Sequence, residues 1–366
     1  MSRAIETDDQ FVAHLVQPPT NSADDSDHDS TYSDDDSSST VNLEGQWQSF
    51  DGIPHSNDEP VQNSKDRLDA EHTLILLVWN RRLYNATVIP KTVLNVGAGT
   101  GAWAMHFGRD HPESTVIGSH SALCQPSWVH SNVEFQLDRL HQPWTWRENL
   151  FDFVCVGNLN HNFADKEHVC TQAFRCAKPG GLVEIHGSEF VIRRNGGSTQ
   201  GPAYHLSQWS RGMYDGLTKL GRMPASASDC VEYMRKTGFE QVESETQKVP
   251  IGDGPADNNL EPIRALANFV FTDRLLPITK RAFVDGLGWE REEVEVFSAL
   301  ARNDIWEAPC YYTTFRIWGR KPALTTSDPV PGAPVTPDMI PFEETLAKIG
   351  DYDATRGALG AGYAKR

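Results

Sequence analysis

The chain has 366 residues, of which 39% are apolar and 23% are charged, and its formal net charge is −17. Residues 1–60 hold 14 acidic residues and one basic residue, so the rest of the chain is nearly balanced, with 36 acidic and 32 basic residues. This length allows about two domains. Without a basic stripe to follow a phosphate backbone, the composition argues against direct nucleic-acid binding.

The N-terminal segment predicts an acidic, largely disordered tail over residues 1–60. Residues 21–40 are almost entirely Ser, Asp and Thr, and such a segment buries too little apolar surface to offset the entropy of ordering. The first ten residues do not resemble a signal peptide, and the longest apolar run, 74–79, is too short to cross a bilayer. We therefore expect no membrane partner, reduced cysteines and a cytoplasmic location, with the nucleus as the alternative.

From residue 64 to residue 185, short apolar strands alternate with helices. The expected helices are residues 64–83, 102–109 and 164–177. The expected strands are residues 92–96, 115–117, 133–137, 151–156 and 182–185. Such alternation is typical of a parallel sheet that is covered on both faces. Right-handed crossovers make it a doubly wound α/β fold.

The second half of the chain is more helical. Its expected helices are residues 203–220, 226–237, 261–272, 278–283 and 291–303. Two strands, 240–249 and 311–319, are embedded among them. The helices at about 200–230 and 255–305 predict insertions that roof an active cleft. We expect residues 323–366, which are rich in Pro, Gly and Ala, to form a mostly irregular C-terminal tail.

A glycine-rich loop, Gly97-Ala98-Gly99-Thr100-Gly101, stands where the first strand passes into a helix. There the backbone can approach a ligand, and the helix N-terminus points its amides at it. The spacing fits a dinucleotide fingerprint ending at Ala102, and it equally fits an S-adenosylmethionine (SAM) loop. A dinucleotide site would have an acidic residue about 20 residues after this loop to bind the ribose, but His120 stands there instead. This absence counts against NAD but also against an ordinary SAM site.

Further motifs follow in order along residues 60–322, and together they resemble the class I SAM-dependent methyltransferases, more narrowly the fungal LaeA-like methyltransferases. The motifs that carry the resemblance are Asp66-Arg67-Leu68-Asp69, Gly101-Ala102-Trp103-Ala104, Val116-Ile117-Gly118, Gln125-Pro126-Ser127-Trp128-Val129, Phe135-Gln136-Leu137-Asp138, Phe151-Asp152-Phe153-Val154 and Lys178-Pro179-Gly180-Gly181.

This resemblance implies a methyltransferase domain over residues 61–322. Its fold would be Rossmann-like, with a seven-stranded sheet and an antiparallel last strand. SAM would lie across the carboxyl ends of the strands. The implied cofactor-binding residues are Asn95, Gly97, Gly99, Gly101, His120, Asp138 and Asn158. Asp138 would accept from the adenine amino group, and Asn158 would face the methyl-transfer site.

The function implied by the resemblance is methyl transfer to a small-molecule acceptor in fungal secondary metabolism. Asn95 and His120 stand where the family usually has acids. Each lost charge-assisted hydrogen bond costs ~1–3 kcal/mol, so two losses would weaken donor binding by roughly thirtyfold to more than ~10⁴-fold. The alternative is therefore a LaeA-like regulatory or degenerate methyltransferase that acts through a protein partner to control gene expression.

Two histidines are candidates for a general base, which is needed where the acceptor must lose a proton. His161 follows the fourth expected strand and His186 follows the fifth. Glu184 and Glu189 flank His186. No sequence motif predicts a metal site. Several aromatic residues are candidates for an acceptor pocket, with core packing as the alternative: Tyr204, Trp209, Tyr214, Trp306, Tyr311 and Tyr312.

Overall fold

The structure is a computed structural model, which describes residues 61–120, 126, 128–138, 140–194, 204–254, 260–307 and 309–323. The predicted tail over residues 1–60 lies outside the described residues, as does the C-terminal tail beyond residue 323. Within the described ranges, none of the helices has the length and apolar character that crossing a membrane requires.

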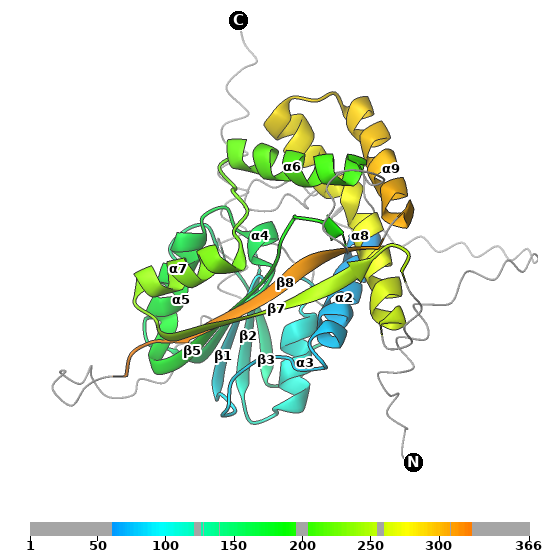
Figure 1. The fold of residues 1–366 in the computed structure, drawn as a ribbon. Helices are drawn as coiled ribbons and strands as arrows, with labels where there is room; N and C mark the ends of the chain where they lie inside the picture. Colours follow the sequence, from blue (N-terminus) through cyan, green and yellow to red (C-terminus); the bar gives the residue numbers. More distant parts are fainter. Residues whose placement is uncertain are drawn as a thin grey trace, which may run out of the picture. The chain divides into compact units, whose positions relative to one another are not determined.

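A mixed sheet with the order β3-β2-β1-β4-β5-β8 forms the centre of the fold, and β7 pairs with the other edge of β8 (Figure 1). Strands β1 to β5 are parallel, whereas β8 runs antiparallel to both β5 and β7. The predicted doubly wound sheet with an antiparallel last strand is therefore confirmed. In the described residues the sheet has eight strands rather than the predicted seven, because the short strand β6 also pairs with β8. The strands are β1 (Thr92–Val96), β2 (Thr115–His120), β3 (Val133–Leu137), β4 (Phe151–Val156), β5 (Ala177–Ser188), β6 (Arg193–Arg194), β7 (Glu240–Ile251) and β8 (Cys310–Arg320).

Helices cover both faces of this sheet (Figure 1). In β1, Val93 packs with α3 (Ala102–Asp110), whereas Leu94 and Val96 belong to the opposite core, formed with α5 (Lys166–Cys176) and α7 (Ala227–Thr237). Successive side chains of a strand point to opposite faces, so a strand buried on both faces reads as one continuous apolar run. This is why a run as short as β1 is recognisable in the sequence.

The second-half helices form a separate packed group with its own core. It contains α6 (Tyr204–Lys219), α8 (Glu261–Lys280), the π-helix η2 (Arg281–Leu287) and α9 (Arg291–Glu307). The N-terminal helix α2 (Val61–Val78) joins this core through buried residues that include Leu74 and Val78, and Trp79 follows it there. The inserted helices therefore hold α2 in place.

The prediction of two separate helices over residues 261–272 and 278–283 is wrong. Helix α8 runs unbroken through Pro277 and passes directly into η2. An interior proline costs about 3 kcal/mol because it removes a backbone donor and clashes with the preceding turn. Here Leu275 and Phe283, one on each side of the proline, are both fully buried in the helical core. Burial of two large side chains offsets that cost.

Candidate functional site

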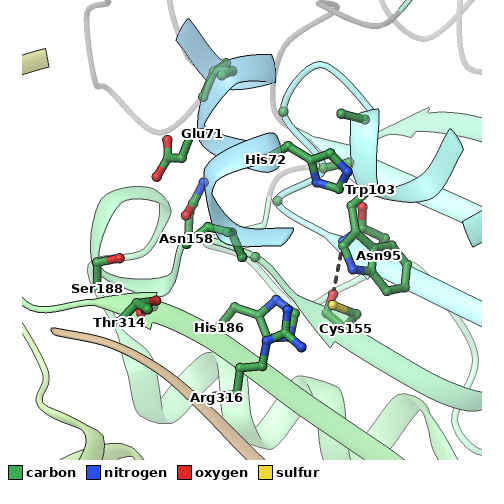
Figure 2. A pocket seen from close by; sticks show the side chains of 18 of the residues that line it. Glu71, His72, Asn95, Trp103, Cys155, Asn158, His186, Ser188, Thr314 and Arg316 are labelled. Atoms are coloured by element: carbon green, nitrogen blue, oxygen red, sulfur yellow. Dashed lines mark hydrogen bonds between the residues drawn. The ribbon is translucent and has the colours of Figure 1, made fainter. Parts of the chain in front are cut away.

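A pocket opens at the carboxyl ends of β1, β4 and β5, between the glycine loop and α2 (Figure 2). Strand β8 closes its far side. The polar side chains that line it are Glu71, His72, Asn95, Thr100, Asn158, His186, Ser188, Thr314 and Arg316. Open α/β sheets hold their ligands at this edge, so the pocket lies where the fold predicts a ligand.

The glycine loop forms one wall of the pocket through Gly97 and Gly99. Gly101, at the N-cap of α3, has φ +88° and does not line the pocket. A Cβ atom on Gly101 would lie 2.3 Å from Cζ of Phe135, whose ring also packs against Gly118. The third glycine of the loop therefore makes room for an aromatic ring from β3.

Helix α2 closes over this loop. The Thr100 hydroxyl donates to the Asp69 carboxylate at 2.5 Å, and Leu68 packs against Gly99. Burial raises the pKa of Asp69, while the bond from Thr100 opposes that rise. The Asp66-Arg67-Leu68-Asp69 motif, which lies about 30 residues before the loop in the sequence, is thus in direct contact with it.

Two asparagines reach the pocket from strand ends. Asn95 on β1 is almost fully buried, and its amide nitrogen donates to the Cys155 carbonyl at 3.4 Å. Its Oδ1 atom is also buried, has no hydrogen-bond partner and belongs to a side chain that lines the pocket. Asn158 follows β4 and adopts a left-handed conformation with φ 49°. Both residues are among those expected to bind the cofactor.

A buried dyad of His186 and Glu184 extends along β5. Nε2 of His186 lies 2.7 Å from Oε1 of Glu184, and the other carboxylate oxygen accepts from the Asn85 backbone amide at 2.8 Å. Because an ionised carboxylate only accepts, Nε2 must donate, and Nδ1 is left as the acceptor. His186 thus lies at the predicted edge of the sheet, and the Glu184 carboxylate orients its ring.

Arg316 on β8 balances the charge of this dyad. It is directly opposite His186 in the sheet register, and its Nε lies 4.0 Å from the Glu184 carboxylate. The guanidinium also lies 4.6 Å from the centre of the Trp79 ring, a cation–π contact. Burial and the Arg316 charge lower the pKa of His186, and the Glu184 contacts oppose this shift. His186 is therefore a neutral imidazole at pH 7.

The roles of three other predicted cofactor-binding residues stay predictions. Gly101, His120 and Asp138 are not among the described residues that line this pocket. The Asp138 carboxylate, expected at the adenine, accepts from both the amide and the hydroxyl of Thr145 at 3.3 Å. The backbone of His161 lies in α4 (Leu159–Asn162), but its side chain lies outside the described part of the structure. Its catalytic role stays a prediction.

The candidate aromatic residues do not line this pocket. Trp209 and Tyr312 are buried in the helical core, and the Trp209 indole donates to the Thr279 hydroxyl. Tyr204, Tyr214 and Trp306 are exposed. For the two buried rings, the alternative of core packing is the one that the structure shows.

The described cysteines are all buried as free thiols, and burial raises the pKa of each. A thiol must ionise to act as a nucleophile, so these residues have no such role at neutral pH. In the described part of the chain, no group of three His, Cys, Asp or Glu side chains could hold a metal ion.

The sequence analysis noted that Glu184 flanks His186 but did not predict the contact between the two side chains. Glu184 carried a usable signal, because residues two apart on a strand share one face of the sheet. His72 and Arg316 carried none, since they reach the pocket from a helix and a strand more than 100 residues away from β5.

The methyltransferase domain family matches residues 75–244 of the chain. The methyltransferase pytC of Aspergillus terreus is 30% identical over 262 residues, which cover 69% of this chain and 80% of pytC. The family match over residues 75–244 includes the glycine loop, β4 and the His186 dyad. A dinucleotide-binding enzyme, the alternative that the loop spacing left open, is not supported.

Two proteins named as secondary metabolism regulators are also similar. LAE1 of Cochliobolus heterostrophus is 24% identical over 275 residues, covering 72% of this chain and 88% of LAE1. The laeA protein of Aspergillus niger is 22% identical over 267 residues, covering 71% of each chain. These findings confirm the resemblance that was based on the ordered sequence motifs.

Proposed function

The chain belongs to the SAM-dependent methyltransferases, in the fungal family that includes pytC and the LaeA-like proteins, and from this premise we propose that it methylates a small-molecule acceptor of secondary metabolism. The observation that carries the proposal is the pocket in which a glycine loop and an oriented His–Glu dyad lie together. The glycine loop recognises the methyl donor, and the His–Glu dyad suits an acceptor that must lose a proton.

The pocket residues fit the donor. Gly97 and Gly99 expose backbone to a ligand, and a Cβ atom on the adjoining Gly157 would lie 3.3 Å from the Gly97 carbonyl oxygen. The unpartnered Oδ1 of Asn95 can accept a hydrogen bond from the donor's methionine part, although it lacks the charge of an acid. Leaving such a buried acceptor unpaired costs about 1–3 kcal/mol, which a bound donor would recover.

SAM supplies an activated methyl group, so the protein's work is to position the acceptor and take its proton. The Glu184 carboxylate fixes the His186 ring, with Nδ1 unprotonated. His186 then accepts the acceptor's proton at Nδ1 while Glu184 stabilises the imidazolium that forms. The Arg316 guanidinium faces the Glu184 carboxylate at 4.0 Å in a buried setting.

Calorimetric titration with SAM and S-adenosylhomocysteine (SAH) tests the donor site. We expect micromolar binding of both, and we expect Asn95→Ala to weaken SAH binding about threefold to tenfold, the value of one hydrogen bond. Ser119→Ala is the matched control, because Ser119 Oγ is also buried without a partner but does not line the pocket. No binding at millimolar ligand would contradict the proposal.

A regulatory role is the second candidate, and the similarity to the laeA and LAE1 regulators supports it. In this case the methyltransferase fold serves as a surface for a protein partner in the control of gene expression. Donor turnover with a panel of fungal metabolites would favour the enzyme. Intact SAH binding without turnover, together with a partner recovered with the purified full-length chain, would favour the regulator.

A further inference from the structure

A second line of polar side chains leads from the pocket to the protein surface. His72 on α2 lines the pocket opposite His186 (Figure 2). Nε2 of His72 lies 3.4 Å from Nδ1 of His106, and Nε2 of His106 lies 3.3 Å from Oδ2 of Asp110. We propose that His72, His106 and Asp110 form a proton relay that returns to solvent the proton released by methyl transfer. The relay rests on the proposed function.

The line runs from the pocket to an exposed carboxylate. His72 lines the pocket, the His106 side chain is 18% exposed, and the Asp110 side chain is 44% exposed. His106 and Asp110 are four residues apart on α3, so they share one face of that helix. One end of the line is thus in the pocket, and the other is in water.

The carboxylate at the outer end fixes the direction of every hydrogen bond. Ionised Asp110 only accepts, so His106 must donate from Nε2, which leaves His106 Nδ1 as an acceptor. His72 must then donate from Nε2, which leaves its own Nδ1 unprotonated. A proton that arrives at His72 Nδ1 can therefore be passed outward, one bond at a time. Both rings must then turn over to restore the starting tautomers before a second proton passes.

The surroundings of His72 prevent it from keeping a proton. Burial lowers the pKa of His72 to about 3, and the positive charges of Arg316 and Arg109 add to this effect. A histidine with this pKa does not stay protonated at pH 7. It can still transfer a proton when the next group accepts one in the same step.

The reaction itself creates the need for an exit. When an acceptor X–H is methylated, the X–C bond forms, the S–C bond breaks and its electron pair stays on sulfur. The proton from X–H goes to Nδ1 of His186, and it must leave before the next turnover. The dyad partner Glu184 is fully buried. His72 lines the same pocket as His186, and its contacts lead to the surface.

Nitrogen NMR of the full chain labelled with ¹⁵N-histidine, with SAH bound at pH 7.5, tests the bond directions. We expect the Nε2 atoms of both His72 and His106 to carry a proton. We expect Asp110→Asn to change the proton distribution of the His106 ring. The control Lys236→Ala removes an exposed cation of α7 that pairs with Glu232, and it should change nothing. A proton on Nδ1 of His72 would overturn the relay.

Turnover provides the second readout, with SAM and a panel of phenolic acceptors, which must lose a proton when they are methylated. We expect His106→Ala to lower kcat tenfold or more with unchanged SAH affinity, and added imidazole to restore it in a concentration-dependent way. Unchanged kcat, or a loss that imidazole does not restore, overturns the relay. If SAH binds but no acceptor reacts, the acceptor class proposed above is wrong, and the NMR result decides the relay alone.

Discussion

Gly101→Ala tests whether the third loop glycine serves packing or the donor. The substitution has two costs: φ +88° is unfavourable for a residue with a side chain, by about 1–2 kcal/mol, and a Cβ atom would lie 2.3 Å from the Phe135 ring. Overpacking of this kind costs about 1–3 kcal/mol. We expect the free energy of unfolding to fall by about 2–5 kcal/mol in urea denaturation.

Gly180→Ala separates the two costs. Gly180 has φ +78°, and a Cβ atom there would meet nothing within 4 Å, so this variant carries the backbone cost alone. We expect Gly101→Ala to lose about 1–3 kcal/mol more than Gly180→Ala, and Phe135→Leu to relieve part of that difference in the double variant. Equal losses in the two variants, or a loss of SAH affinity without a loss of stability, would refute the packing argument.

Three further predictions concern the dyad, the inserted helices and the pocket histidine. Glu184→Gln should lower kcat by about 10²–10⁴-fold and lower the His186 pKa further in an NMR titration, because the carboxylate that favours the imidazolium is lost. Gly216→Ala should lower the free energy of unfolding by about 3 kcal/mol, since its Cβ would lie 2.1 Å from a carbonyl oxygen of η2, while the exposed neighbour Asp215→Ala should change it little. Below pH 6.5, His72 binds a proton in the unfolded chain but stays unprotonated in the folded chain. The free energy of unfolding should therefore fall by up to about 1.4 kcal/mol per pH unit toward pH 3. In His72→Asn, denaturation measured over that range should show a smaller dependence of this free energy on pH.

Most of the sheet could be predicted from the sequence because its strands are buried on both faces. The predicted limits of β1, β3 and β4 agree with the structure residue for residue. β5 is longer than predicted, since the Lys178-Pro179-Gly180-Gly181 turn signal falls inside it, where the strand register shifts between Phe151 and Phe153 of β4. Turn residues mark a local irregularity, but the pairing of neighbouring strands continues across it.

The candidate site was less predictable than the fold because its polar contacts join distant parts of the chain. Asp138 follows β3 as expected, yet Thr145 supplies its hydrogen bonds, and local sequence does not indicate that contact. Arg316 and Glu184 are 132 positions apart, and only the antiparallel β5–β8 register brings their side chains to one face. Residue type and strand position therefore suggest candidates, whereas the register decides which of them meet.

The electrostatics of the pocket suit a cationic donor even though Asn95 has replaced an acid. The donor's sulfonium carries a positive charge, so a protonated histidine beside it would oppose binding by several kcal/mol in a buried site. Burial and Arg316 keep both His72 and His186 neutral at pH 7 by lowering their pKa values. Arg316 itself faces the Glu184 carboxylate, which offsets its charge. In the proposed mechanism, the lowered pKa that keeps His186 available as a base also removes the repulsion that an imidazolium would exert on the donor.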